Sequence, residues 1–69
     1  MLKIVKGPYE KGGKKFIDVI AETSKAAFEA TCFWDATTWR DIDTGQLFYS
    51  DEINNAILAK EAREALNNG

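Results

Sequence analysis

The sequence predicts a single small domain of the α+β class, a two-layer ββαββα arrangement with two β-hairpins and two helices. Three observations predict it: a β-branched and aromatic run at residues 15–22, an alanine-rich run at residues 25–34, and a serine followed by two acidic residues at 50–52. The chain has 69 residues, too few for two domains, and no linker, internal repeat or low-complexity tract divides it. We therefore expect one domain over residues 1–69.

The first hairpin is predicted from two strands and the glycine residues between them. Residues 2–6 partly alternate apolar and polar side chains, and residues 15–22 are rich in β-branched and aromatic side chains. Gly7-Pro8 and Gly12-Gly13 separate these segments as turn residues. Because proline has no N–H to donate to a neighbouring strand, we expect residues 2–6 to form an edge strand.

A helix is expected next, from residue 25 to about residue 34. Thr23 or Ser24 can cap it, because a side-chain oxygen there accepts a hydrogen bond from an N–H of the first turn. One broad face of this helix carries small and aromatic side chains: Ala26, Ala27, Ala30, Phe33 and Trp34. Phe28 and Cys32 fall on the opposite side, which either meets another layer or is exposed.

A second hairpin is predicted over residues 37–49. Residues 37–42 and residues 46–49 contain threonine, tryptophan, phenylalanine and tyrosine, which are typical of strands. They flank Asp43-Thr44-Gly45, and three turn residues ending in glycine suit a hairpin with a G1 bulge.

The last helix is predicted from about residue 51 to residue 66. Ser50 supplies a capping hydroxyl, and Asp51 and Glu52 lie at the positive end of the helix dipole. Ile53 and Ile57 lie together and can pack on the sheet. The other apolar residues lie elsewhere on the helix, as a dimer seam or a frayed tail: Leu58, Ala62, Ala65 and Leu66.

Residue types argue against an enzyme, a metal centre and a bound cofactor. The sequence has no histidine and one cysteine, Cys32, which the helix prediction places far from the N-terminus that would lower its pKa. No calcium-loop spacing or multi-cysteine pattern is present, so we expect no metal and no cofactor. No apolar run approaches the roughly 20 residues of a membrane helix, and Met1 to Ile4 do not resemble a signal peptide, so a cytoplasmic location is expected.

Charge is divided along the chain. Residues 1–15 carry five lysines and one glutamate, whereas residues 16–69 carry four basic and ten acidic residues. Lys11, Lys14 and Lys15 surround the Gly12-Gly13 turn and are candidate phosphate contacts, because turn N–H groups and ammonium groups together bind anions. The alternative is a solvated turn, and the sequence pI near 5.0 argues against a nucleic-acid surface.

The acidic and aromatic middle of the chain predicts a partner-binding surface. Aromatic and arginine side chains are frequent interface anchors, and carboxylates can mimic the phosphates of a nucleic acid. The candidate contact residues are Trp39, Arg40, Tyr49, Phe28, Asp35, Asp41, Asp43, Asp51 and Glu52.

Each part of that surface has a structural alternative. The acidic residues can serve the turn and the helix dipole, and both tryptophans can belong to the core. On residues 15–22, Phe16 and Ile20 share one strand face. If helices cover only the other face, these two side chains form an exposed apolar patch of the kind that marks a binding site.

Residues 18–30 read Asp-Val-Ile-Ala-Glu-Thr-Ser-Lys-Ala-Ala-Phe-Glu-Ala, a strand predicted to lead into an alanine-rich helix behind an N-terminal hairpin. In this the chain is similar in style to small phage-encoded proteins, namely inhibitors of host RNA polymerase and some anti-CRISPR proteins. The resemblance implies a stoichiometric inhibitor that occludes a site on a host machine, within the host cytoplasm.

The function expected from these observations is a non-enzymatic protein-binding module. It would occlude a basic, nucleic-acid-binding surface of a larger host protein or ribonucleoprotein complex, without a membrane and without nucleic acid as its direct ligand. Two alternatives remain open: a nucleic-acid-binding protein that uses the lysine hairpin, and a homodimeric structural protein joined through the C-terminal helix.

Overall fold

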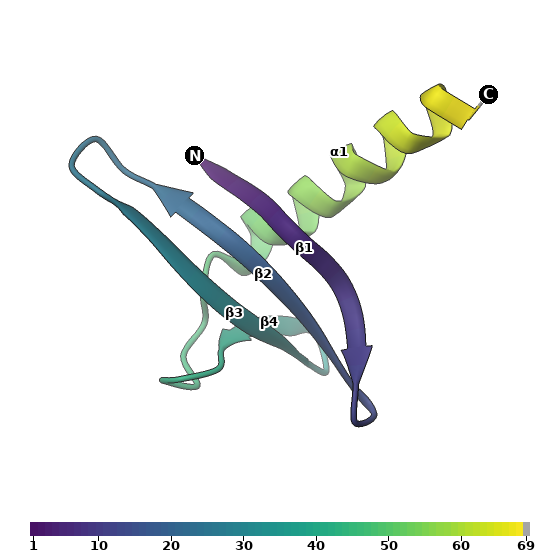
Figure 1. The fold of residues 1–69 in the computed structure, drawn as a ribbon. Coiled ribbons are helices and arrows are strands. Elements are labelled where there is room, and N and C mark those ends of the chain that lie inside the picture. Colours follow the sequence, from purple (N-terminus) through teal and green to yellow (C-terminus); the bar gives the residue numbers. More distant parts are fainter. Residues whose placement is uncertain (69) are drawn as a thin grey trace.

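The computed structural model describes residues 1–68 as one antiparallel sheet and one helix (Figure 1). The strands follow one another across the sheet in the order β1-β2-β3-β4. They span β1 Leu2–Lys11, β2 Lys14–Glu22, β3 Ala27–Asp35 and β4 Thr38–Asp41, and the helix α1 spans Ser50–Asn68. The predicted α+β class is confirmed. The predicted pair of helices is wrong, because the described chain has one.

The segment predicted as a helix over residues 25–34 is the strand β3. It pairs with β2 along its whole length, with Cys32 opposite Ile17 and Ala30 opposite Val19. With β3 paired beside them, Ile17 and Val19 lie inside the sheet and their side chains are buried in the core. The advantage of alanine in a helix, by contrast, is below about 1 kcal/mol per residue. Burial therefore outweighs the helical preference of the alanines.

Neither predicted cap of that helix has this role. Thr23 Oγ1 accepts hydrogen bonds from the N–H groups of Lys25 (3.2 Å) and Ala26 (3.1 Å), so it closes the turn between β2 and β3. Ser24 is exposed in the same turn. Side-chain oxygens of this kind stabilise a tight turn as well as a helix start, which is why the two are hard to distinguish in a sequence.

The first hairpin is confirmed and is longer than predicted. Its tip is Gly12-Gly13, both with positive φ (61° and 80°), a conformation that glycine adopts without strain. Gly7-Pro8 does not end the strand: β1 runs through it, with register shifts on either side of Lys6. β1 is an edge strand, as the proline predicts.

The second hairpin differs from the prediction. β4 pairs mainly with β3, through a tight turn at Ala36-Thr37. Residues 46–48 return beside β4 with a single bridge, Arg40 to Leu47, and two hydrogen bonds: Asp41 N–H to Gln46 O at 2.8 Å, and Phe48 N–H to Trp39 O at 3.2 Å.

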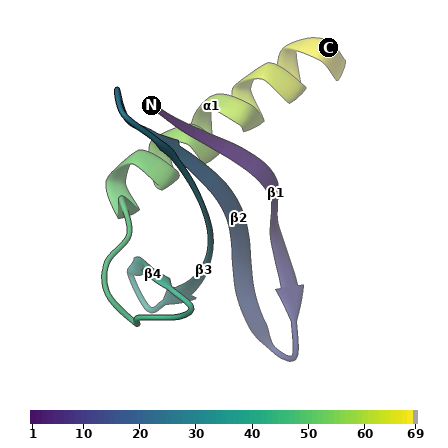
Figure 2. The ribbon, with the colours of Figure 1, turned by 60° about the vertical axis from the view of Figure 1, so that its left-hand side comes forward.

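The helix α1 is confirmed over the predicted range, but Ser50 does not cap it in the expected way. Ser50 Oγ accepts a hydrogen bond from the backbone N–H of Trp39 at 2.9 Å, which attaches the start of α1 to β4. From there α1 crosses behind the sheet, and its C-terminal end lies beyond β1 (Figures 1 and 2). It is not long and apolar enough to cross a membrane.

The core lies between the sheet and the first half of α1. It consists of Ile17, Val19, Cys32, Trp39 and Ile53, with Ile57 packed against it. The Trp39 indole N–H donates to Asn54 Oδ1 at 3.0 Å, so its polar atom is satisfied inside the core. Since α1 covers only this side, the opposite face of the sheet is uncovered (Figure 2).

Candidate functional site

The uncovered side of the sheet, here called the open face, carries a row of aromatic side chains. Strand register places Tyr9 opposite Phe16, Phe16 opposite Phe33, and Phe33 opposite Arg40. The rings of Tyr9 and Phe16 are stacked, with centroids 5.9 Å apart. These three rings, together with the Arg40 side chain that ends the line, are here called the aromatic row, which crosses all four strands.

Both ends of the aromatic row are held in place. Arg40 Nε donates to Asp35 Oδ2 at 2.8 Å, and Arg40 Nη1 donates to Gly45 O at 3.0 Å. At the other end, Lys6 Nζ lies 5.1 Å from the centre of the Tyr9 ring, within the range of a cation–π contact. The row is therefore ordered before any partner binds.

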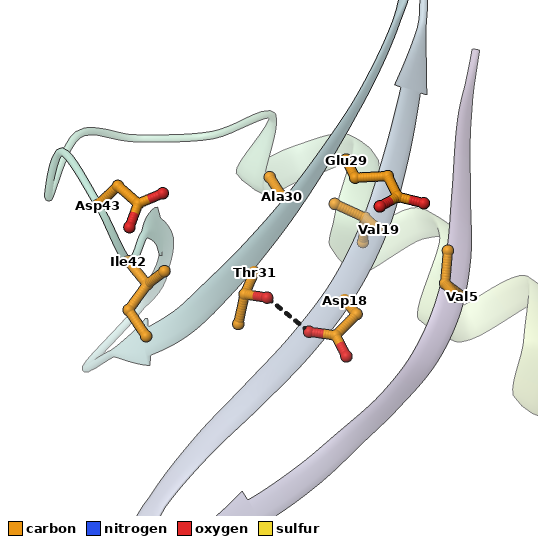
Figure 3. A pocket seen from close by; sticks show the side chains of 8 residues that line it. All are labelled: Val5, Asp18, Val19, Glu29, Ala30, Thr31, Ile42 and Asp43. Carbon is orange, nitrogen blue, oxygen red and sulfur yellow. Dashed lines mark hydrogen bonds between the residues drawn. The ribbon is translucent and has the colours of Figure 1, made fainter.

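Beside the aromatic row the open face forms a hollow of about 470 Å³ (Figure 3). Its polar lining includes Asp18, Glu29, Thr31 and Asp43, and its apolar lining includes Val5 and Ile42. All of its ionisable lining residues are carboxylic acids, so we call it the acidic hollow. Figure 3 shows that these side chains come from β1, β2, β3 and the segment after β4.

Asp18 links the hollow to the aromatic row. Its Oδ1 accepts hydrogen bonds from Thr31 Oγ1 at 2.8 Å and from the Tyr9 hydroxyl at 3.1 Å. Desolvation, followed by the hydrogen bond and charge of Asp18, raises the pKa of Tyr9 above its ordinary value. Tyr9 therefore stays protonated near neutral pH and keeps donating to Asp18.

The predicted contact residue Trp39 is not available to a partner. Its side chain is 2% exposed and belongs to the core, which is the alternative that the sequence also allowed for the tryptophans. The error follows from the false helix: with residues 25–34 placed in the sheet, β4 presents Trp39 to α1 and Arg40 to the open face.

Apart from Asp41, the other predicted contact residues fall into two groups. Arg40, Asp35 and Asp43 lie on or beside the open face. Asp41 is used within the chain, because its Oδ1 accepts the backbone N–H groups of Asp43 (2.7 Å) and Thr44 (3.1 Å).

The second group lies on the helix side of the sheet. Phe28 is opposite Ala21, whose side chain faces the core, and Tyr49 and Glu52 line a small pocket that also includes Ala21. Asp51 lies in the first turn of α1. The predicted surface is therefore two separate patches rather than one.

Five residues of this site were not predicted: Tyr9, Asp18, Glu29, Thr31 and Phe33. The predicted helix placed Phe33 on its broad face of small and aromatic side chains, and the assignment of a turn to Gly7-Pro8 removed Tyr9 from the strand. The alternation on residues 15–22 was a usable signal: Phe16 and Ile20 do lie on the uncovered face, half-buried, as that alternation indicated.

The remaining candidates lie outside the open face or carry no reactive chemistry. Lys11, Lys14 and Lys15 are exposed at the tip of the first hairpin, with Lys11 opposite Lys14. Burial, followed by the charges of Asp41 and Asp18, raises the pKa of the Cys32 thiol to about 11, so it is protonated at neutral pH. Within residues 1–68 no group of three or more metal-ligating side chains is placed to hold an ion.

No protein-family model, curated protein or solved structure matched this chain. Its function is therefore inferred from the geometry and chemistry of residues 1–68.

Proposed function

We propose that this chain is a small non-enzymatic protein-binding module that covers a basic surface of a larger partner with its open face. The observation that carries the proposal is the aromatic row beside the acidic hollow, on a sheet face that α1 leaves uncovered. A nucleic-acid-binding surface of a host complex has the chemistry that this face complements.

The aromatic row favours a protein ligand. Aromatic and arginine side chains are enriched among the residues that dominate the binding energy of protein interfaces. Aromatic rings in particular bury a large area with few rotatable bonds. Beside the row, Val5 and Ile42 line the hollow with 59% and 50% of their surface exposed. Mixed apolar and polar surface of this kind is typical of protein interfaces.

The hollow favours a basic partner. Asp18 already accepts two hydrogen bonds, whereas Glu29 and Asp43 are exposed carboxylates. Among residues 1–68 no cationic side chain lines the hollow. Charge complementarity of this kind accelerates encounter and selects the partner. A lysine or arginine side chain of the partner fits between Glu29 and Asp43, with its methylene groups against Val5 or Ile42.

Occlusion is the mechanism that such a module supports. A bound domain of 7.7 kDa excludes nucleic acid from a basic groove both sterically and through its carboxylates. The resemblance to phage inhibitors rests on a strand leading into a helix at residues 18–30, whereas residues 27–30 belong to β3. The open face, and not that resemblance, supports the inhibitor role.

The test is an NMR titration of the isotope-labelled protein with a synthetic peptide of about ten residues that alternates arginine and leucine. We expect shifts of backbone amide signals in β2, β3 and residues 41–43, with an affinity that falls as salt is added. The double variant Glu29→Gln, Asp43→Asn should bind at least about fivefold more weakly at low salt.

The matched control is Asp51→Asn, Glu52→Gln, which removes the same charge from the helix side and should bind as the unmodified protein does. Equal weakening in both variants would show that only net charge matters. Shifts confined to the helix side would show that the open face is not the binding surface, and either result contradicts the proposal.

One observation favours a second candidate, the binding of single-stranded nucleic acid. Lys11 and Lys14 lie at the same end of the open face as Tyr9 and Phe16, with Lys15 beside them at the hairpin tip but on the helix side, and rings beside cations provide stacking and phosphate contacts. Fluorescence anisotropy with a labelled oligothymidine of about 15 nucleotides tests it. Salt-sensitive binding that disappears when the three lysines are replaced by alanine would favour this candidate over a protein partner.

A further inference from the structure

A groove of about 500 Å³ runs between β1 and α1, on the helix side of the sheet and away from the acidic hollow. Leu2 and Ile4 line it from β1, and Ala56 and Ala59 line it from α1. Lys60 closes it toward the middle of β1, because its Nζ donates to Gly7 O at 3.2 Å. The groove thus has apolar walls along the first residues of the edge strand.

The backbone of β1 beside this groove has unused hydrogen-bonding groups. Met1 and Glu22 exchange two hydrogen bonds, N–H to O at 2.8 Å and 2.7 Å. In the antiparallel register the next position of β1 that faces β2 with its N–H and C=O groups is therefore Lys3. In such a ladder the residues between hydrogen-bonded pairs direct N–H and C=O away from the neighbouring strand. Leu2 and Ile4 therefore direct these groups outward, where no strand of the described chain pairs with them.

Cationic residues flank this part of β1 on both sides of the sheet. Lys60 and Arg63 line the groove from α1, with Lys60 also paired with Glu64 at 3.3 Å, and Lys3, which is opposite Ile20, directs its side chain to the open-face side of the same edge. Lys3 and Arg63 are exposed. Lysines along an edge strand discourage pairing with another copy of the same strand through like-charge repulsion, and they attract an acidic segment.

We infer that the outer edge of β1 binds an extended acidic peptide segment of a partner protein by strand addition. Backbone groups of the segment pair with those of Leu2 and Ile4. Every second side chain is apolar and packs into the groove, against Ala59 for example. The alternate side chains are acidic and face Lys3. The groove itself lies on the opposite side of the sheet from the acidic hollow, and the inference does not depend on the function proposed for the open face.

The experiment combines amide hydrogen exchange with a titration by a capped peptide of about seven residues that alternates glutamate and valine. We expect the N–H groups of Leu2 and Ile4 to exchange at least about tenfold more slowly in the complex, because they become hydrogen-bonded. A peptide with lysine in place of glutamate, and one with prolines in place of valines, should leave their exchange unchanged.

Matched variants separate the groove from overall charge. Lys3→Glu, Arg63→Glu should weaken peptide binding at least about tenfold. Lys11→Glu, Lys14→Glu makes the same change at the hairpin tip and should leave it unchanged.

Each of the following results would overturn the inference: no binding of the glutamate peptide, binding without protection of Leu2 and Ile4, equal binding of the lysine peptide, or equal weakening by the tip variant. Protection that appears without peptide as the protein concentration rises would identify a second copy of the chain as the occupant, which also contradicts it.

Discussion

Single residues decide which side chains remain available to a partner. Trp39 and Arg40 are neighbours in β4, yet one fills the core and the other ends the aromatic row, because successive strand residues point to opposite faces. The polar atoms of both are hydrogen-bonded, Trp39 to Asn54 and Arg40 to Asp35. Their different roles follow from the position of α1, which covers one face.

Replacing Trp39 by phenylalanine tests its place in the core. The variant loses the hydrogen bond to Asn54 and part of the buried ring, so we expect the free energy of unfolding to fall by about 2–4 kcal/mol. Urea denaturation measures this. Trp34→Phe is the control and should cost less, since Trp34 is only partly buried and no hydrogen bond from its indole is seen within residues 1–68. Equal losses would contradict the assignment of Trp39 as the core residue.

The raised pKa of the Cys32 thiol makes the free energy of unfolding depend on pH in the alkaline range. The thiol has a pKa of about 11 in the folded chain against 9.0 for an unperturbed thiol. Above pH 9 the unfolded chain loses this proton and the folded chain keeps it, so stability falls as pH rises through this window, by at most about 1.4 kcal/mol per pH unit. In Cys32→Ala the fall between pH 9 and 11 should be shallower. Denaturation curves at several pH values measure it, and parallel curves for the two proteins would contradict it.

At the scale of elements, β4 connects the sheet to α1. It is short, yet it contributes a core tryptophan, and the Trp39 N–H is bonded to Ser50 Oγ at the start of the helix. The hydroxyl that the sequence marks as a helix cap therefore joins two elements instead. The same side chain can do either, because both roles need only an oxygen near an unpaired N–H.

Ser50→Ala tests this connection. It leaves the Trp39 N–H without its acceptor, so we expect a loss of about 1–2 kcal/mol in the free energy of unfolding and faster hydrogen exchange of that N–H. Ser24→Ala in the exposed β2–β3 turn is the control and should change stability by less than about 0.5 kcal/mol. An unchanged exchange rate at Trp39 would show that the hydrogen bond does not stabilise this junction.

At the scale of the whole molecule, the open face and the outer edge of β1 are not covered by another described element, and the C-terminal end of α1 packs against nothing in the described chain. Leu58 and Leu66 on α1 are 64% and 81% exposed, and residues 61–67 are all exposed. Exposed leucines at this end of α1 are compatible with a dimer seam and equally with a frayed tail.

Shortening the chain so that it ends at Arg63 distinguishes them. We expect a frayed tail, because a helix end of this length contributes little stability by itself. The free energy of unfolding should then change by less than about 0.5 kcal/mol, and the mass in sedimentation should match a monomer before and after shortening. Sedimentation over a range of concentrations provides the measurement. A dimer that becomes a monomer on shortening would establish the seam and contradict this expectation.

The sequence by itself determined the first hairpin, its edge strand and the last helix. Each depends on a local pattern: alternation and a glycine turn for the hairpin, the missing N–H of proline for the edge, and acidic residues at the dipole's positive end for α1. The alternation also placed Phe16 and Ile20 on one strand face, which would be open only if helices covered the other face alone.

Tertiary structure alone decided residues 25–35, and with them the candidate site. Helical preference of alanine is a small local energy, whereas pairing with β2 and burial of Cys32 beside Ile17 are gained only when the segment lies in the sheet. With that segment as β3, only α1 remains to cover the sheet. The four aligned side chains from Tyr9 to Arg40 then share an uncovered face that no local pattern places together.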